Sequence, residues 1–186
     1  MPNESRMTPH LNPRDPWVIS THDLGLRAGS MRKVSTTLPA PADLAVGMIG
    51  VPKDADVELD FRLEAVVEGV LVTGTATAPL SGECSRCLDP ITSEIEVGFQ
   101  ELFFYEAEDA AEDDSLLDGE LFNLEPVFRD AVVLALPFSP MCRDDCPGLC
   151  TECGARLADD PGHHHGEAVD ARWAALQELV IEEKES

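Results

Sequence analysis

Residues 57–87 read VELDFRLEAVVEGVLVTGTATAPLSGECSRC. From 57 to 64 apolar and charged residues alternate, which is typical of a strand with one buried face. Glu68-Gly69 predicts a hairpin turn, and the β-branched residues of 70–80 predict a second strand paired with the first. The stretch therefore predicts an antiparallel hairpin that leads into a Cys-x-x-Cys pair, Cys84 and Cys87.

Three further strands are predicted around this hairpin. One is short, at 17–19, and another covers 31–38 after a turn that contains Gly25 and Gly29. The third covers 91–105. Its alternation slips before Phe103-Phe104, and a bulge is one explanation. Together these segments predict an antiparallel meander.

One helix is predicted after the last strand. Asn123 is a candidate cap, Pro126 is allowed in the first turn, and Pro137 ends the helix. Four apolar residues recur at helical spacing and predict the buried face: Val127, Ala131, Leu134 and Ala135. The predicted fold class is α+β, with an antiparallel sheet packed against one or two helices.

The chain is expected to have four parts. Residues 1–15 form a disordered leader, and 16–137 form the sheet and helix domain. Within this domain 106–120 holds eight carboxylates and no basic residue, which predicts a solvated acidic loop rather than a packed element. Residues 138–166 form a cysteine- and histidine-rich zinc segment, and 167–186 form a C-terminal helix that starts near Asp170.

Length and charge exclude several classes of protein. With 186 residues the chain is about one domain, too short for a large multidomain enzyme. The net charge of −23 disfavours phosphate-driven binding of nucleic acid and favours a basic partner. No apolar run is long enough for a membrane span, and the first residues lack the apolar core of a signal peptide. The chain is therefore expected to be cytoplasmic.

The six cysteines are the main chemical clue. In a reducing compartment they are more typical of metal ligands or redox thiols than of disulfides. Two Cys-x-x-Cys pairs are present, Cys84 with Cys87 and Cys150 with Cys153, and each can present two thiolates to one tetrahedral ion. The segment from 138 to 166 has few core-forming residues, so we expect zinc to hold it together.

Six thiols exceed the four ligands of one structural zinc, which leaves two arrangements. In the favoured one, a first zinc takes Cys84, Cys87, Cys142 and Cys146, and a second takes Cys150 and Cys153 with two of His163, His164 and His165. For that second site we select His163 and His165. In the other arrangement Cys84, Cys87, Cys150 and Cys153 form one site, and the remaining thiols are bystanders. A polar turn without metal is an equally good interpretation of the three histidines.

Evidence for catalysis is thin. The chain has no G-x-S-x-G, P-loop, G-x-G-x-x-G or H-E-x-x-H motif. A zinc ion with four protein ligands has no open position for water or substrate. We therefore predict a protein that is not an enzyme and has no small-molecule substrate.

The motifs in combination resemble the YceD family, also called the large ribosomal RNA subunit accumulation protein family. They are Cys84-Ser-Arg-Cys87-Leu after a hairpin, the acidic loop, FRDAVVLALP at 128–137, and the pattern from Cys142 through Cys146-Pro-Gly-Leu-Cys150 to Cys153-Gly. The resemblance covers about residues 17–183. It implies a non-enzymatic cytoplasmic factor needed for large-subunit rRNA accumulation, and it implies metal ligation by the six cysteines. Where some members have further cysteines, this sequence has His163–His165.

The charge of the chain bears on how such a factor works. An acidic protein is better suited to hold a basic ribosomal protein, or a precursor of the large subunit that contains one, than to coat RNA. Direct RNA contact stays open, since Arg27, Arg32 and Lys33 form a small basic segment. The main alternative function is a zinc- or redox-responsive regulatory protein whose thiols release metal on oxidation. A metal donor and an RNA-modifying enzyme are further alternatives.

Overall fold

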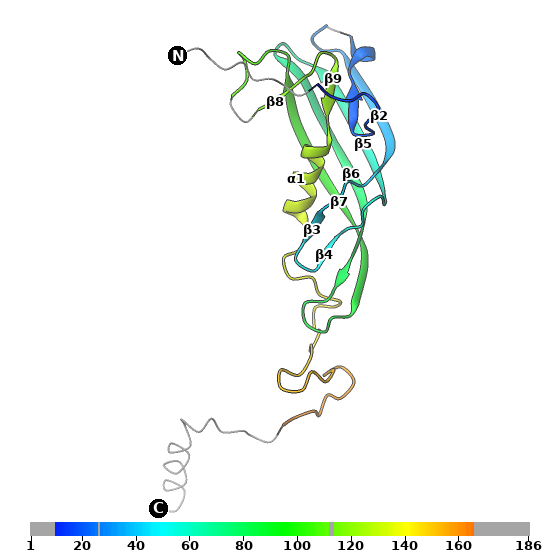
Figure 1. Cartoon of the computed structure of the whole chain (residues 1–186), viewed down its shortest axis with the longest axis vertical. Helices are drawn as coiled ribbons and strands as arrows, with labels where there is room; N and C mark the ends of the chain where they lie inside the picture. Colours follow the sequence, from blue (N-terminus) through cyan, green and yellow to red (C-terminus); the bar gives the residue numbers. More distant parts are fainter. Residues whose placement is uncertain (1–9, 26, 112–113, 166–186) are drawn as a thin grey trace, which may run out of the picture. The chain divides into compact units, whose positions relative to one another are not determined.

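The computed structural model describes residues 10–25, 27–111 and 114–165 (Figure 1). The chain divides into two compact units, Met1–Cys142 and Arg143–Ser186. All helices and strands among the described residues belong to the first unit. The predicted C-terminal helix and the first nine residues of the predicted leader lie outside the described residues. No helix in the described part of the chain is long and apolar enough to cross a membrane.

Seven strands of the described residues form one sheet in the first unit (Figure 1). Its four longest strands are β2 (Met31–Pro39), β5 (Asp56–Ala65), β6 (Gly69–Glu83) and β7 (Pro90–Phe104), in that spatial order and antiparallel. Near its end, β6 also pairs with β4 (Ile49–Val51), which in turn pairs with β3 (Leu44–Val46). The short strand β8 (Ser115–Leu116) runs parallel to the end of β7. The predicted antiparallel sheet is therefore confirmed.

The hairpin predicted from 57–80 is β5 and β6, with Ala65 opposite Val70 and Glu58 opposite Thr77. The inward residues of β5 are almost fully buried, and the alternating charged residues face the other side of the sheet. Val66 and Gly69 close the turn through a backbone hydrogen bond of 2.9 Å. Alternation fixed this register because a slip of one residue would place every buried side chain in water.

The bulge predicted in the third strand is wrong. β6 and β7 pair without interruption from Gly69 opposite Phe104 to Glu83 opposite Pro90. The apparent slip has another cause, since Glu101 occupies an inward position, where it accepts a hydrogen bond from the Ser115 hydroxyl at 2.8 Å. Leu102 lies on the opposite face, so apolar residues occur on both faces near the end of the strand.

The single described α-helix, α1 (Glu125–Ala135), packs against one face of the sheet, where it contacts β7 and β3 (Figure 1). Its first turn donates a hydrogen bond to a residue outside the helix, from the backbone N–H of Glu125 to the side-chain oxygen of Asn123 at 3.0 Å. It ends before Leu136, whose extended conformation is the one favoured before a proline such as Pro137. The predicted stop signal is therefore confirmed, whereas the predicted cap is off by one residue, since Leu124 holds the cap position and Asn123 precedes it.

The predicted buried face of α1 is only partly correct, because Val127 and Ala131 are half-buried against the core but other residues form the centre of the buried face. Leu124, Phe128 and Val132 are fully buried, whereas Leu134 is 85% exposed and Ala135 is also exposed. Both sets of residues recur at helical spacing, so periodicity alone could not choose between them. The larger side chain of Phe128 decides the orientation, because it stacks on Trp17 with ring centroids 4.7 Å apart.

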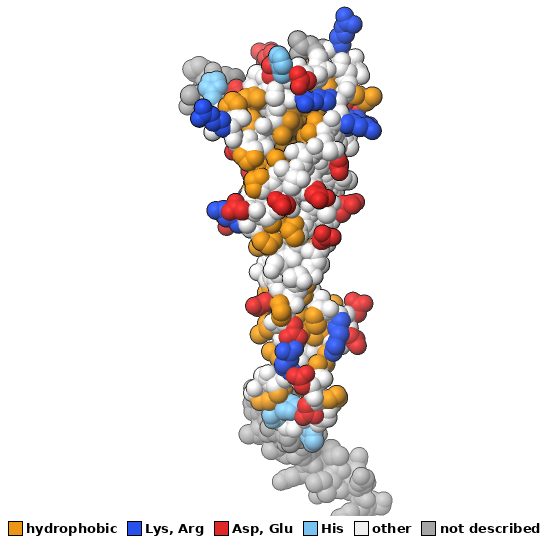
Figure 2. Space-filling view, turned by 90° about the vertical axis from the view of Figure 1, so that its right-hand side faces the viewer, with side chains coloured by type: hydrophobic (Ala, Val, Ile, Leu, Met, Phe, Trp, Pro, Cys, Tyr) orange, Lys and Arg blue, Asp and Glu red, His pale blue; other side chains and the backbone are white. Residues whose placement is uncertain are grey.

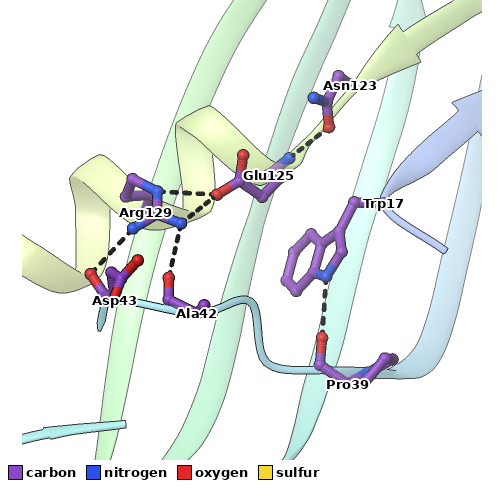
Figure 3. A network of polar contacts seen from close by, with 7 residues as sticks. All are labelled: Trp17, Pro39, Ala42, Asp43, Asn123, Glu125 and Arg129. Carbon is purple, nitrogen blue, oxygen red and sulfur yellow. Dashed lines mark hydrogen bonds and ion pairs between the residues drawn. The ribbon is translucent and has the colours of Figure 1, made fainter. Parts of the chain in front are cut away.

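Polar contacts anchor α1 beside the sheet (Figure 3). Arg129 pairs with Glu125 at 2.6 Å and donates to the backbone carbonyls of Ala42 and Asp43 at 2.8 and 2.9 Å. On the other side of the helix start, the Trp17 indole N–H donates to the Pro39 carbonyl at 2.9 Å. Arg129 thus joins the helix to the segment between β2 and β3, and Trp17, which stacks on Phe128, joins it to the end of β2.

A second sheet consists of β1 (Val18–Ser20) and β9 (Leu121–Asn123), paired antiparallel. The strand at 17–19 was predicted within one residue, but β9, β3 and β4 were not predicted. Each has three residues, too few to show a period of two. A short 3-10 helix, η1 (His22–Leu24), follows β1.

The acidic segment 106–120 is only partly the predicted loop. Ser115–Leu116 forms β8 and Leu117 is buried, because the SLL sequence gives this otherwise charged stretch apolar side chains to pack. Elsewhere in the first unit the carboxylates are dispersed. Figure 2 shows acidic side chains at several separate places on the visible face of the molecule.

Candidate metal centres

The first Cys-x-x-Cys pair is the connection between β6 and β7. The Cys84 N–H donates to the Asp89 carbonyl at 2.8 Å, and the Leu88 N–H donates back to the Cys84 carbonyl at 2.9 Å. This tight turn follows from the paired ends of the two strands, since Glu83 lies opposite Pro90. It leaves Cys84 fully buried and Cys87 8% exposed.

A third thiol reaches this turn from the segment after α1. The Ser85 N–H donates to the Pro140 carbonyl at 2.8 Å, which holds that segment beside the turn. As a result the sulfur atoms of Cys87 and Cys142 lie 3.6 Å apart. In a tetrahedral zinc site with Zn–S bonds of about 2.3 Å, two sulfurs are about 3.8 Å apart, so this spacing fits the ion.

The first group of candidate ligands is completed by Cys146, four residues further along the chain. The sulfur atoms of Cys84, Cys87, Cys142 and Cys146 all lie within 4.8 Å of one another. Cys146 is buried, and Cys142 is the exposed member of the group. Four thiols at this spacing are the donor set that structural zinc prefers.

The electrostatic environment of Cys84 favours its thiolate. Burial raises the pKa of this thiol, but backbone N–H groups of Arg86, Cys142 and Cys87 donate to the sulfur and outweigh burial, so the pKa falls from 9.0 to about 6. Since metal binds the thiolate and not the thiol, a lowered pKa prepares the residue for ligation.

The second Cys-x-x-Cys pair repeats the hydrogen bonds of the first. The Cys150 N–H donates to the Ala155 carbonyl, and the Gly154 N–H donates to the Cys150 carbonyl, both at 2.8 Å. Backbone N–H groups of Cys153 and Glu152 lower the pKa of the Cys150 thiol to about 6, against the opposing effect of burial. Gly148, two residues before Cys150, has a φ of 80°, a backbone conformation that glycine adopts without strain.

Two of the three adjacent histidines join this second pair. The Nε2 atoms of His163 and His165 each lie 3.2 Å from the Cys153 sulfur and 3.1 Å from each other. Together with Cys150 they place four candidate ligand atoms within 4.8 Å of one another. His164 points elsewhere, with its Nδ1 atom 2.9 Å from the Gly162 carbonyl oxygen.

A carboxylate lies near the Nδ1 atom of each of these two histidines, on the side of the ring away from Cys153. The Nδ1 atom of His163 is 3.7 Å from Asp160, and that of His165 is 3.4 Å from Glu152. A carboxylate beside Nδ1 favours the tautomer that leaves Nε2 free to bind a metal, and such pairs recur around zinc sites. Sequence reasoning missed Asp160 and Glu152 because nothing distinguishes them among 36 acidic residues.

The structure groups the eight predicted ligands as in the favoured arrangement. Cys84, Cys87, Cys142 and Cys146 form one group, and Cys150, Cys153, His163 and His165 form the other. Both cysteine-rich groups could bind a metal ion, and the donor sets are those of structural zinc. That the eight residues bind metal, and that the metal is zinc, stays a prediction.

The family comparison covers both groups. The family described as "Large ribosomal RNA subunit accumulation protein YceD" matches residues 72–180, which is more than half of the chain. The chain belongs to the YceD family. The family name connects its members with accumulation of the RNA of the large ribosomal subunit, and the matched range contains every predicted ligand.

Relatives of this YceD-family chain occur in several bacteria. Uncharacterized proteins of Mycobacterium tuberculosis and Mycobacterium bovis are each 43% identical over 92% of this chain and 84% of their own length. The uncharacterized protein YlbN of Bacillus subtilis is 26% identical over 68% of this chain and 73% of its own. No solved structure gives a significant match.

Proposed function

We propose that this protein is a non-enzymatic cytoplasmic factor that supports accumulation of large-subunit rRNA and biogenesis of the large ribosomal subunit. Two structural zinc ions hold its cysteine-rich segment, and its acidic surface engages a basic partner. The observation that carries the proposal is the YceD-family match over residues 72–180.

Two features support a structural role for the metal. Each candidate group offers four protein ligands, which fills a tetrahedral zinc and leaves no position for substrate or water. Residues 143–165 contain no helix or strand among those described, and their one bridge joins Leu149 to Arg156. A segment with so little regular structure needs another source of stability, and zinc binding supplies folding free energy directly.

The acidic surface supports a basic protein as the partner. With 36 acidic and 13 basic residues the chain repels RNA phosphates over most of its surface and attracts basic proteins such as those of the ribosome. The proposal therefore assigns it a precursor of the large subunit, or a basic ribosomal protein, as its direct contact. The proposal assigns the protein no small-molecule substrate.

Depletion in the native host tests this function. Ribosomes are separated on a sucrose gradient, and each fraction is probed for large- and small-subunit rRNA. We expect a selective loss of large-subunit rRNA that the wild-type chain restores when it is expressed again. An unchanged ratio of the two rRNAs, with depletion verified by blotting, would contradict the proposal.

A regulatory function is the second candidate, and one observation favours it. Cys153 is exposed, and Cys150 beside it has a lowered pKa, which is the environment of an oxidisable thiol. If this function holds, mild peroxide should release one zinc per chain, a thiol reductant should restore it, and depletion should leave the rRNA ratio unchanged.

A further inference from the structure

In the described part of the chain, one edge of β7 is unpaired along most of its length. β6 pairs with one edge of this strand from Pro90 to Phe104, and β8 pairs with the other edge at Phe103 and Phe104 alone. Within the described residues, no strand pairs with that second edge from Pro90 to Leu102. Its outward backbone N–H and C=O groups are therefore available to another strand.

This edge is acidic and has no basic residue of its own. On the sheet face opposite α1, Glu94 and Glu96 are exposed, and residues 90–104 contain no Lys or Arg. On the face that carries α1, Ile91 and Ile95 are half-buried against the core. A strand added here would have carboxylates along one of its faces and apolar groups along the other.

The helix extends the apolar side. Arg129 bonds to the carbonyls just before β3, so the Arg129 flank of α1 faces β3. At about 100° per residue, Val127, Ala131 and Leu134 lie on the opposite flank, which faces the β7 side because α1 also packs on that strand. Val127 and Ala131 are half-buried against the core, whereas Leu134 is 85% exposed, so the described residues leave Leu134 and the outer part of this apolar flank uncovered.

We propose that the β7 edge surface, defined as the free edge from Pro90 to Leu102 with Val127, Ala131 and Leu134, binds an extended segment of a basic protein. The segment adds to the sheet as a strand, a recognised mode of peptide binding. Because side chains alternate along a strand, Lys or Arg residues would face Glu94 and Glu96, and apolar residues would face α1. The inference rests on the proposed function, in which the partner is basic.

Charge argues against the other occupants of this edge. Two copies paired antiparallel along the full 90–102 edge would place Glu96 of one chain opposite Glu96 of the other, and like charges opposed across strands are unfavourable. The segment 166–186 of the chain itself holds six acidic and two basic residues. A basic segment from another protein is the occupant that the charges favour.

Amide hydrogen exchange of the full, zinc-loaded chain tests whether the edge is free. We expect alternate amides of 90–102 to exchange faster than those of β6, and to become protected when a peptide binds. The probe is a peptide of about nine residues that alternates Lys and Val, enough to pair with most of the edge. Its control has the same composition with all Lys residues first. Uniform protection of 90–102 in the free chain would overturn the inference. So would a dimer, detected by light scattering, whose formation protects the amides of 90–102.

Variants then test the two sides of the surface by fluorescence anisotropy of the labelled peptide. Glu94→Lys with Glu96→Lys, and separately Leu134→Asp, should each weaken binding by about tenfold or more. Asp56→Lys with Glu58→Lys is the matched charge control, since both residues are exposed on the same sheet face at the same spacing, on β5. Val67→Asp is the control for Leu134, because Val67 is 84% exposed in the β5–β6 turn. Both controls should bind as wild type.

Equal binding of the alternating and block peptides, without protection of 90–102, would reduce the surface to non-specific attraction and overturn the inference. Complementation separates this failure from failure of the proposed function. If the Leu134→Asp chain restores large-subunit rRNA in the depleted host as wild type does, the inference fails and the proposed function stands. If depletion leaves the rRNA unchanged, the proposed function fails whatever the peptide does.

Discussion

Leu88 and Gly154 occupy the same position in two Cys-x-x-Cys turns. Each directly follows the second cysteine, each donates its N–H to the carbonyl of the first, and each has a positive φ, 60° and 73° respectively. The two turns therefore share one backbone conformation, although they lie more than 60 residues apart in the sequence. Glycine adopts this conformation without strain, whereas for leucine it costs about 1–2 kcal/mol.

Substitutions at these two positions should act in opposite directions. Gly154→Ala should weaken zinc binding at the second group by about fivefold, because about 1 kcal/mol of backbone strain is added where folding and binding are coupled. No atom lies within 4 Å of the added Cβ, so strain alone is tested. Leu88→Gly should leave the free energy of unfolding unchanged or raise it by up to about 1 kcal/mol, since lost strain is partly offset by entropy of the unfolded chain.

Competition with a chromophoric chelator and urea unfolding measure these two effects. Gly162→Ala is the control for Gly154, because Gly162 has no positive φ. Leu88→Ala is the control for Leu88, because it removes the side chain and keeps the strained backbone. Tighter zinc binding by Gly154→Ala would show that the shared turn is not the ligand-holding conformation.

The sequence predicted the long strands from several signals: alternation in β5 and β7, β-branched residues in β6, and the preceding turn for β2. β5 alternates over its whole length, and so do the buried residues of β6. The sequence pattern was misleading where one inward position is polar, as at Glu101. It was also misleading in α1, where two sets of apolar residues recur at helical spacing. In both cases tertiary contacts decide, and a single sequence does not record them.

The candidate site was predictable to the extent that it is local. Two cysteines separated by two residues meet in one turn, so each pair could be assigned from spacing alone. Which pair joins Cys142 depends on the return of the chain after α1, which the bond from Ser85 to Pro140 fixes. The carboxylates behind His163 and His165 gave no signal, because acidic residues occur throughout this chain.

Loss of a thiol from the first group should remove metal and stability together. Cys84→Ser or Cys146→Ser is expected to lower the zinc content from two ions per chain to one and to reduce the melting temperature, because zinc binding is coupled to folding. Atomic emission and a thermal scan measure the two quantities. Met141→Ser, next to Cys142, should change neither. Unchanged metal content in both cysteine variants would exclude the first group as a zinc site.

The three adjacent histidines should differ in their effect on the second zinc. His163→Asn or His165→Asn should lower the zinc content to one ion, since each removes an Nε2 atom that faces Cys153. His164→Asn should retain two ions, because that ring is turned to the Gly162 carbonyl. An equal loss in all three variants would mean that the histidines do not bind as the structure places them.

Acid should destabilise the metal-free chain in a defined window. The folded-state pKa values of Cys84 and Cys150 are about 6, below the ordinary value of 9.0. The stability that these two thiolates give the folded state is therefore fully present above pH 9 and is lost as the pH falls through about 6. The urea midpoint of the reduced, metal-free protein should therefore fall from pH 9 to pH 5. In the double variant Cys84→Ser with Cys150→Ser, the urea midpoint should fall less between pH 9 and pH 5. An equal fall would contradict the lowered pKa values.

The carboxylate behind His163 should tune the second site without being a ligand. Asp160→Asn removes the charge that orients this ring, and loss of such a carboxylate typically weakens metal affinity by about 10- to 100-fold. The zinc content at saturating metal should remain two ions, whereas competition with a chelator should show the weaker binding. Asp159→Asn is the matched control, since Asp159 faces Arg156 instead of a histidine. Equal affinities in the two variants would mean that the histidine tautomer is set without Asp160, and the contact would then be a surface ion pair with no effect on the metal.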